Sequence, residues 1–243
     1  MIKQVRDASK DPVLLLDAGN ALIGQDLSMK SKGMVIVDAM NAMGYDAMAI
    51  GGLDLQEGLD AFLDAMKEAR FAAVACNVVS IASGKPLLQP YTIIQRNGGR
   101  FGILGVSGSD LLTAADASSR LKVLDAVETV RQYLPEVRKQ SDVVIVLSQL
   151  GLEGSKALAE AVTGLDIIVS GGTTELLESP VQVGDTLVVQ AGYNGEWLGR
   201  LDVGLASAGK LTEPKVQIIT LGPEIADDPD LAQLVEDYKQ LFP

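Results

Sequence analysis

The chain contains no histidine and only one cysteine among its 243 residues. Histidine is the usual general base beside a nucleophilic serine or cysteine, so Ser-His-Asp and Cys-His catalysis are excluded. Cys76 has no second thiol with which to form an internal disulfide. Its neighbours in FAAVACNVVSI are apolar, which predicts a buried structural thiol.

Aromatic residues and long apolar runs are also scarce. Aromatics make up 4% of a chain that is 47% hydrophobic, so aliphatic side chains must fill the core. No apolar run reaches the roughly 18 residues of a membrane span, and no apolar signal core follows Met1. We expect no membrane span. We expect a cytoplasmic protein as numbered, or a periplasmic or exported one if a leader was removed.

Positive charge is the third shortage, because 20 Lys and Arg residues face 32 Asp and Glu residues. The resulting net charge of −12 repels the phosphates of nucleic acids and of anionic lipids. We therefore expect no nucleic-acid partner. An acidic surface suits a basic or cationic partner.

The sequence does contain short apolar runs that alternate with helical patterns. Strands are predicted over Val13–Ala18, Ala47–Ile50, Ala72–Val78, Tyr91–Gln95, Arg100–Val106, Val143–Ser148, Asp166–Ser170, Thr186–Gln190, Trp197–Val203 and Lys215–Thr220. Helices are predicted over Gly33–Met43, Gln56–Ala69, Lys122–Lys139, Gly154–Val162 and Asp230–Leu241. Asn97-Gly98 predicts the tight turn of a β-hairpin. This mixture predicts a layered α/β fold, an αββα sandwich of two mixed β-sheets flanked by helices.

Four of the predicted strands end in unusual residues. These ends read DAGN at 17–20, GGLD at 51–54, SQLG at 148–151 and GGTTE at 171–175. If the strands are neighbours in one sheet, their ends meet at one rim, which is the usual place for the chemistry of an α/β protein.

At these ends the chain resembles the catalytic domain of the calcineurin-like metallophosphoesterases. It is most similar to the 5′-nucleotidase branch, with thiosulfohydrolase-type relatives nearby. Six blocks carry the resemblance, in order, between Ile2 and about Phe242. They are VLLLDAGNALIGQ, VDAMNAMGYDAMAIGG, GKPLLQPYTIIQRNGGRFGILGV, SDVVIVLSQLGLEG, LDIIVSGGTTELLESP and VVQAGYNGEWLGRLDV.

The resemblance implies two divalent ions held by carboxylates, histidines and an asparagine, which activate water for attack on phosphorus. This sequence departs from that pattern. The family's bridging aspartate falls on Asn20, its Asn-His pair on Gly52 and Leu53, and its following carboxylate on Asp54. The histidine of the next block falls on Gln149, and the final His-x-His falls on Gly172 and Thr174. We therefore expect no bound metal and no cofactor.

Weaker signals surround the same rim. Asn20, Asp54, Gln149 and Glu175 offer oxygens for a poor new cation site. The glycine pairs at 51–52 and 171–172 lack the lysine of a phosphate-binding loop, so they are interpreted as turns. Glu175, Tyr193, Asn194 and Trp197 form a possible binding rim, with core or hairpin packing as the alternative for the two aromatics.

The resemblance also implies a domain organisation. We expect a metallophosphoesterase-like domain over residues 1–222, a capping helix over 223–243, and no C-terminal nucleotide-specificity domain. Met1 falls in what would be the family's first helix, so the strand with Asp-x-His is expected to be missing. The edge beside Val13–Ala18 would then be unpaired and open to another chain.

Three functions are compatible with these observations. The favoured one is a catalytically inactive relative that acts as a binding or structural subunit, with protein partners or a second copy of itself. The second is a metal-dependent phosphoesterase with a rebuilt site. The third is a small-ligand binder that uses the remaining cleft.

Overall fold

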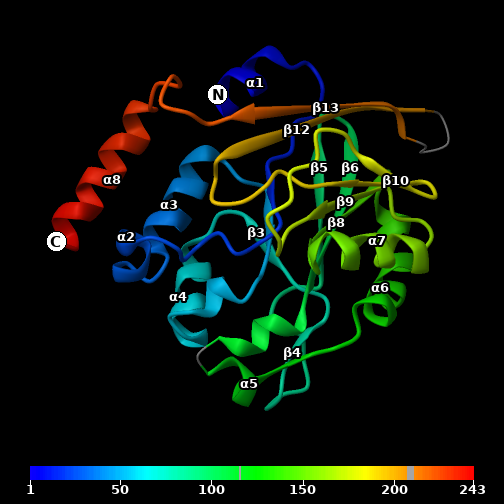
Figure 1. Ribbon diagram of the computed structural model, residues 1–243. Coiled ribbons are helices and arrows are strands. Elements are labelled where there is room, and N and C mark those ends of the chain that lie inside the picture. The colour runs from blue at the N-terminus through cyan, green and yellow to red at the C-terminus, as the bar shows by residue number, and fades with distance from the viewer. Residues whose placement is uncertain (115, 207–210) are drawn as a thin grey trace.

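Two β-sheets lie face to face between two sets of helices (Figure 1). The computed structural model describes residues 1–114, 116–206 and 211–243. The helices are α1 Ile2–Ala8, α2 Asp26–Lys30, α3 Met34–Met43, α4 Leu59–Glu68, α5 Ala117–Arg120, α6 Ala126–Gln140, α7 Gly151–Ala161 and α8 Pro229–Leu241, with short 3-10 turns at η1 Leu53–Leu55 and η2 Ser109–Thr113. The strands are β1 Leu16–Asp17, β2 Ala47–Ala49, β3 Ala72–Val74, β4 Val78–Ser80, β5 Tyr91–Arg96, β6 Gly99–Ser107, β7 Leu121–Val123, β8 Val143–Gln149, β9 Ile167–Ser170, β10 Val181–Val183, β11 Thr186–Val189, β12 Trp197–Leu205 and β13 Leu211–Thr220.

The larger sheet has the strand order β10-β11-β9-β8-β6-β5. Its four central strands are parallel, while β5 and β10 pair antiparallel at the two edges. The smaller sheet has the order β1-β2-β3 and contains only parallel pairs among the described residues. The predicted layered α/β fold is therefore confirmed. Only the larger of the two sheets is mixed.

Alternation along the strands builds three apolar layers. In β8, Val144 and Val146 face α6 and α7, whereas Ile145 and Leu147 face the space between the sheets. In β2, Met48 faces α3 and α4, and Ala47 and Ala49 face the other sheet. A period of two thus gives each strand one face for its helices and one for the opposite sheet. β8 is buried along its whole length, as expected of a central parallel strand.

Two further predictions from sequence are confirmed. Asn97 and Gly98 have φ values of 47° and 84°, and they join β5 to β6 as the predicted hairpin turn. Cys76 is 1% exposed, and burial raises the pKa of its thiol to about 12, so it is the expected inert core residue.

Some predicted helix and strand bounds were wrong, in two cases because the segment pairs with residues far away in sequence. The helix predicted from Lys122 begins at Ala126, because Leu121–Val123 pairs with β4 in a small separate sheet. The strand predicted over Ala72–Val78 divides into β3 and β4, because the Cys76 N–H turns to donate to Gly105 O at 2.8 Å. The helix predicted from Gly154 begins one turn earlier, at Gly151.

Three features complete the arrangement. No strand of the described residues pairs with the side of β1 that faces away from β2. The hairpin β12–β13 forms its own two-stranded sheet and packs Leu201 and Leu211 against the layer between the main sheets. Helix α8 lies beside α3, where Tyr238 donates a 2.6 Å hydrogen bond to Asp38 (Figure 1).

Among the described helices, none has the length and apolar character needed to cross a bilayer.

Candidate functional site

The four strand ends singled out in the sequence do converge. The loops after β1, β2, β8 and β9 meet at one edge of the two facing sheets, where hydrogen bonds and close contacts connect them. This edge is formed by the carboxyl ends of parallel strands, the usual location of a site in such folds. We call this group of loops the rim.

At the centre of the rim, Asn20 and Gln149 bind each other. Asn20 Nδ2 donates to Gln149 Oε1 at 3.0 Å, and Gln149 Nε2 donates to Ala18 O at 2.7 Å. Asn20 Oδ1 accepts the backbone N–H of Leu53 at 2.9 Å. Both amides therefore use their donors and acceptors on neighbouring protein groups.

Asp54 holds the loop after β1 in place. Its two carboxylate oxygens accept four backbone N–H groups at 2.8–2.9 Å, from Asn20, Ala21, Leu22 and Gly51. The side chain belongs to η1 and the residue is 3% exposed. Burial raises the pKa of Asp54, and the four N–H donors oppose that rise.

Two glycines make room for the central amides. A Cβ at Gly51 would lie 2.1 Å from Asn20 Oδ1 and 2.9 Å from Gln149 Oε1. A Cβ at Gly171 would lie 2.8 Å from Gln149 Nε2. The amide side chains at the centre therefore lie directly against the backbone of these two glycines.

The other positions implied by the resemblance carry no ligand group. Gly52 has no side chain, and Leu53 points an apolar side chain into solvent with 48% exposure. Gly172 has a left-handed φ of 83° and lies against Gln149, while Thr174 is exposed on the same loop.

Gln190, which follows β11, binds the loop that carries Glu175 of the predicted binding rim. Its Nε2 donates to Thr173 O and Thr173 Oγ1 at 3.1 Å and to Glu175 Oε2 at 3.3 Å. Hydrogen bonds from Thr173 and Gln190 help to lower the pKa of the exposed Glu175 carboxyl. The Oε1 atom of Gln190 is buried and has no hydrogen-bond partner among the described residues. The sequence analysis did not single out this residue, since one glutamine after a strand gives no signal.

The two aromatics lie in the same turn region. Tyr193 is 45% exposed, and its ring centroid lies 6.4 Å from that of the half-buried Trp197. The Trp197 ring covers Gly192, where a Cβ would come within 2.4 Å of it. Asn194 is exposed between them with a φ of 57°. Trp197 therefore packs on the loop that precedes β12, and Tyr193 is the side chain that solvent reaches.

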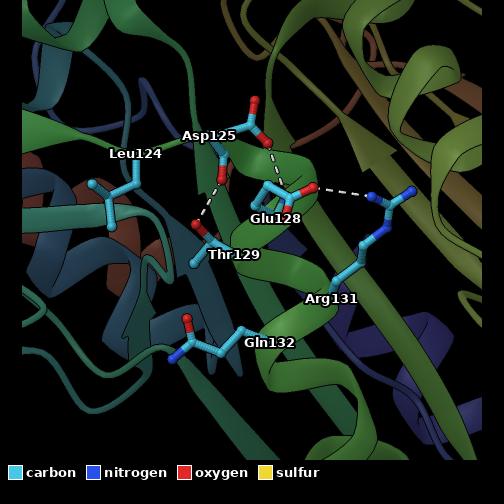
Figure 2. Close-up of a pocket in the computed structure, with 6 residues that line it drawn as sticks. All are labelled: Leu124, Asp125, Glu128, Thr129, Arg131 and Gln132. Atoms are coloured by element: carbon cyan, nitrogen blue, oxygen red, sulfur yellow. Dashed lines mark hydrogen bonds and ion pairs between the residues drawn. The ribbon is translucent and has the colours of Figure 1, made fainter.

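Two hollows lie on the surface. One of about 390 Å³ adjoins the rim and is lined by the ends of β6, β8 and β9, including Asp110, Gln149, Gly151 and Thr173. Another of about 500 Å³ lies at the start of α6 (Figure 2). There the polar side chains bind one another: Asp125 accepts the Glu128 N–H, and Arg131 contacts Glu128 at 3.0 Å. It is lined by Leu124, Asp125, Glu128, Thr129, Arg131 and Gln132, and none of these belongs to the rim.

The residues of the rim do not fit the two divalent ions that the resemblance implies. Asp54 directs both oxygens at backbone N–H groups, and the oxygens of Asn20 and Gln149 accept protein donors. Glu175 is engaged by Gln190 and does not join the other three residues of the suggested cation site. Within residues 1–114, 116–206 and 211–243, no group of three or more acidic, cysteine or histidine side chains is placed to hold a metal ion.

Asp17 belongs to the strand end DAGN at the rim, and the sequence analysis gave it no role of its own. Its Oδ1 accepts the Gly19 N–H at 2.8 Å. Burial raises the pKa of this carboxyl to about 6, the Gly19 N–H lowers it, and the charge of Asp54 raises it further.

Comparison with known proteins agrees with this architecture. No family model matches the chain. The snake venom 5′-nucleotidase of Gloydius brevicauda is 29% identical over 98% of the chain, which spans 44% of that relative. The structure of a 5′-nucleotidase precursor from Thermus thermophilus superposes with a TM-score of 0.91 and 28% identity, over 99% of this chain and 51% of that one.

A third comparison concerns the fold alone. The sulfate thiohydrolase SoxB of Thermus thermophilus has a TM-score of 0.91 and 23% identity, covering 99% of this chain and 45% of its own. The chain thus spans about half the length of each of these three proteins. From its homologues and its fold, the chain is a metallophosphoesterase-like domain of the 5′-nucleotidase branch.

Proposed function

We propose that this chain is a non-catalytic member of the 5′-nucleotidase branch that serves as a binding or structural subunit of a protein assembly. The observation that carries the proposal is the mutual engagement of Asn20, Gln149 and Asp54. A hydrolytic centre needs groups that are free to bind an ion or move a proton, and these groups are bound to each other and to the backbone.

Exposed side chains at and near the rim support the docking of a partner. Leu53 at the rim exposes 48% of its surface, and Tyr193 in the loop after β11 exposes 45%. Such apolar and aromatic groups are common anchors in interfaces. The surrounding acidic charge suits a basic partner.

The test is purification from native extracts under non-denaturing conditions. We expect a stoichiometric partner with the wild-type chain, and its loss with Leu53→Lys and Tyr193→Lys. Ile81→Lys is the matched control, because Ile81 is 56% exposed beside the small β4–β7 sheet rather than at the rim. A wild-type chain that elutes alone as a monomer at native concentration would contradict the proposal.

The second candidate is a metal-dependent phosphoesterase, and it is favoured by the activity named in the relatives. It is tested with a 5′-nucleotide and a generic phosphate ester in the presence of Mn²⁺, Mg²⁺ or Zn²⁺. Phosphate release that follows the added ion, and that Asp54→Asn abolishes while the fold persists by circular dichroism, would establish it. Absence of turnover with all three ions would exclude it.

The third candidate is a small-ligand binder, and it rests on the 390 Å³ hollow beside Gln149. A ligand that binds only the native state raises the melting temperature by mass action. A thermal-shift screen of nucleosides, nucleotides and small anions tests it, with Thr173→Trp as the variant that blocks the hollow. A shift that survives the blocking variant would place the ligand elsewhere.

A further inference from the structure

The contact between Asn20 and Gln149 joins the two main sheets. Asn20 follows β1 in the smaller sheet, and Gln149 is the last residue of β8 in the larger one. Gln149 reaches the smaller sheet a second time, because its Nε2 donates to Ala18 O at 2.7 Å. A third link lies beside them, where Ser107 Oγ, at the end of β6, donates to Ile50 O at 2.7 Å.

Two of the linking side chains are buried, Asn20 is half-buried, and the network leaves little space. Gln149 and Ser107 are 3% and 1% exposed. The Cβ distances at Gly51 and Gly171 show that the amides touch the opposite backbone. A buried hydrogen bond of this kind is costly to break, because the partner left behind stays desolvated.

We propose that this amide network is a metal-free closure of the site: it holds the two sheets together at this edge and leaves no oxygen set for a divalent ion. The amide oxygens that could bind an ion already accept hydrogen bonds from protein N–H groups. Asp54, the carboxylate at the centre, is fixed by four backbone N–H groups and cannot turn toward an ion without leaving them unpaired. The network does not depend on whether a partner protein binds at the rim.

The test compares two variants of Asn20. Asn20→Asp keeps the size of the side chain and adds the carboxylate that an ion would favour, but it removes the donor to Gln149 Oε1. Asn20→Gly removes the side chain without backbone strain, because Asn20 already has a φ of 61°. Gln233→Ala is the control, since Gln233 makes a 2.7 Å bond to Asp237 on the exposed face of α8.

We expect both Asn20 variants to melt about 4–8 °C below the wild type, which corresponds to about 2 kcal/mol at the 2–4 °C per kcal/mol of a chain of this size. Gln233→Ala should melt within about 1 °C of the wild type, because exposed pairs contribute little. Millimolar Mn²⁺ or Zn²⁺, or a chelator, should move neither the wild type nor Asn20→Asp. Calorimetric titration of the wild type with both ions should show no binding heat, and this reading does not depend on any variant folding.

Two results would overturn the inference. Recovery of the Asn20→Asp melting temperature by Mn²⁺ or Zn²⁺, absent in Asn20→Gly, would mean that the site still accepts an ion. An Asn20→Gly variant as stable as the wild type would mean that the link does not hold the sheets. Neither result would affect the test for a docked partner, so the two proposals fail separately.

Discussion

Asp17 is a half-buried carboxylate whose protonation is coupled to folding. Its pKa is about 6 in the folded chain and close to 3.9 in an unfolded one. Because the folded pKa is raised, the charged form destabilises the fold above about pH 6. That penalty disappears as the pH falls through 6 toward 4. A shift of about two pKa units, discounted for partial exposure, corresponds to roughly 1–2 kcal/mol.

Replacement of Asp17 by Asn tests this coupling. Asn keeps an oxygen for the Gly19 N–H and carries no charge. We expect Asp17→Asn to raise the free energy of unfolding by about 1–2 kcal/mol at pH 8, with the difference shrinking to near zero at pH 4. Denaturant titrations over this pH range would measure it, with the exposed Asp227→Asn as control. A difference that does not change with pH would point to packing rather than charge.

At the scale of single elements, the local hydrophobic pattern predicted those strands and helices whose bounds depend on nearby residues. β8 is apolar along its length and was placed within one residue, because a central parallel strand needs no partner-specific signal. Lys122 and Val123 were assigned to a helix, because β4, the strand partner of Leu121–Val123, lies over forty residues away in sequence. The rim loops were found from glycine, asparagine and acidic residues after strands. The Asn20–Gln149 link was not, because no local signal connects residues 129 positions apart.

The close approach of β6 to β3 gives a prediction at the same scale. A Cβ at Gly105 would lie 2.0 Å from Val74 O, so the two sheets meet there through a position without a side chain. We expect Gly105→Ala to lower the free energy of unfolding by about 3 kcal/mol, because the backbones must move apart within a packed core. Urea denaturation would measure it. Gly24→Ala, at which a Cβ meets nothing within 4 Å, should change stability by less than about 0.5 kcal/mol.

At the scale of the whole molecule, negative charge exceeds positive charge. The net charge is −12, while many lysine and arginine side chains already lie in exposed ion pairs such as Lys67–Asp64 and Lys239–Glu236. Exposed pairs contribute little each, whereas the excess of carboxylates repels itself over the whole surface. Added salt screens both the repulsion between acidic groups and the attraction within the ion pairs. We expect the relief of repulsion to be the larger effect, so salt should stabilise the fold.

Raising the salt concentration tests that balance. The screening length falls from about 30 Å at 0.01 M ionic strength to about 8 Å at 0.15 M, so repulsion between distant carboxylates weakens. We expect the melting temperature to rise by about 2–4 °C over this range at pH 7.5, equivalent to roughly 1 kcal/mol for a chain of this length. Sodium and potassium chloride should act alike, since screening depends on ionic strength. A melting temperature that falls instead would mean that the surface ion pairs hold the fold more strongly than its net charge opposes it.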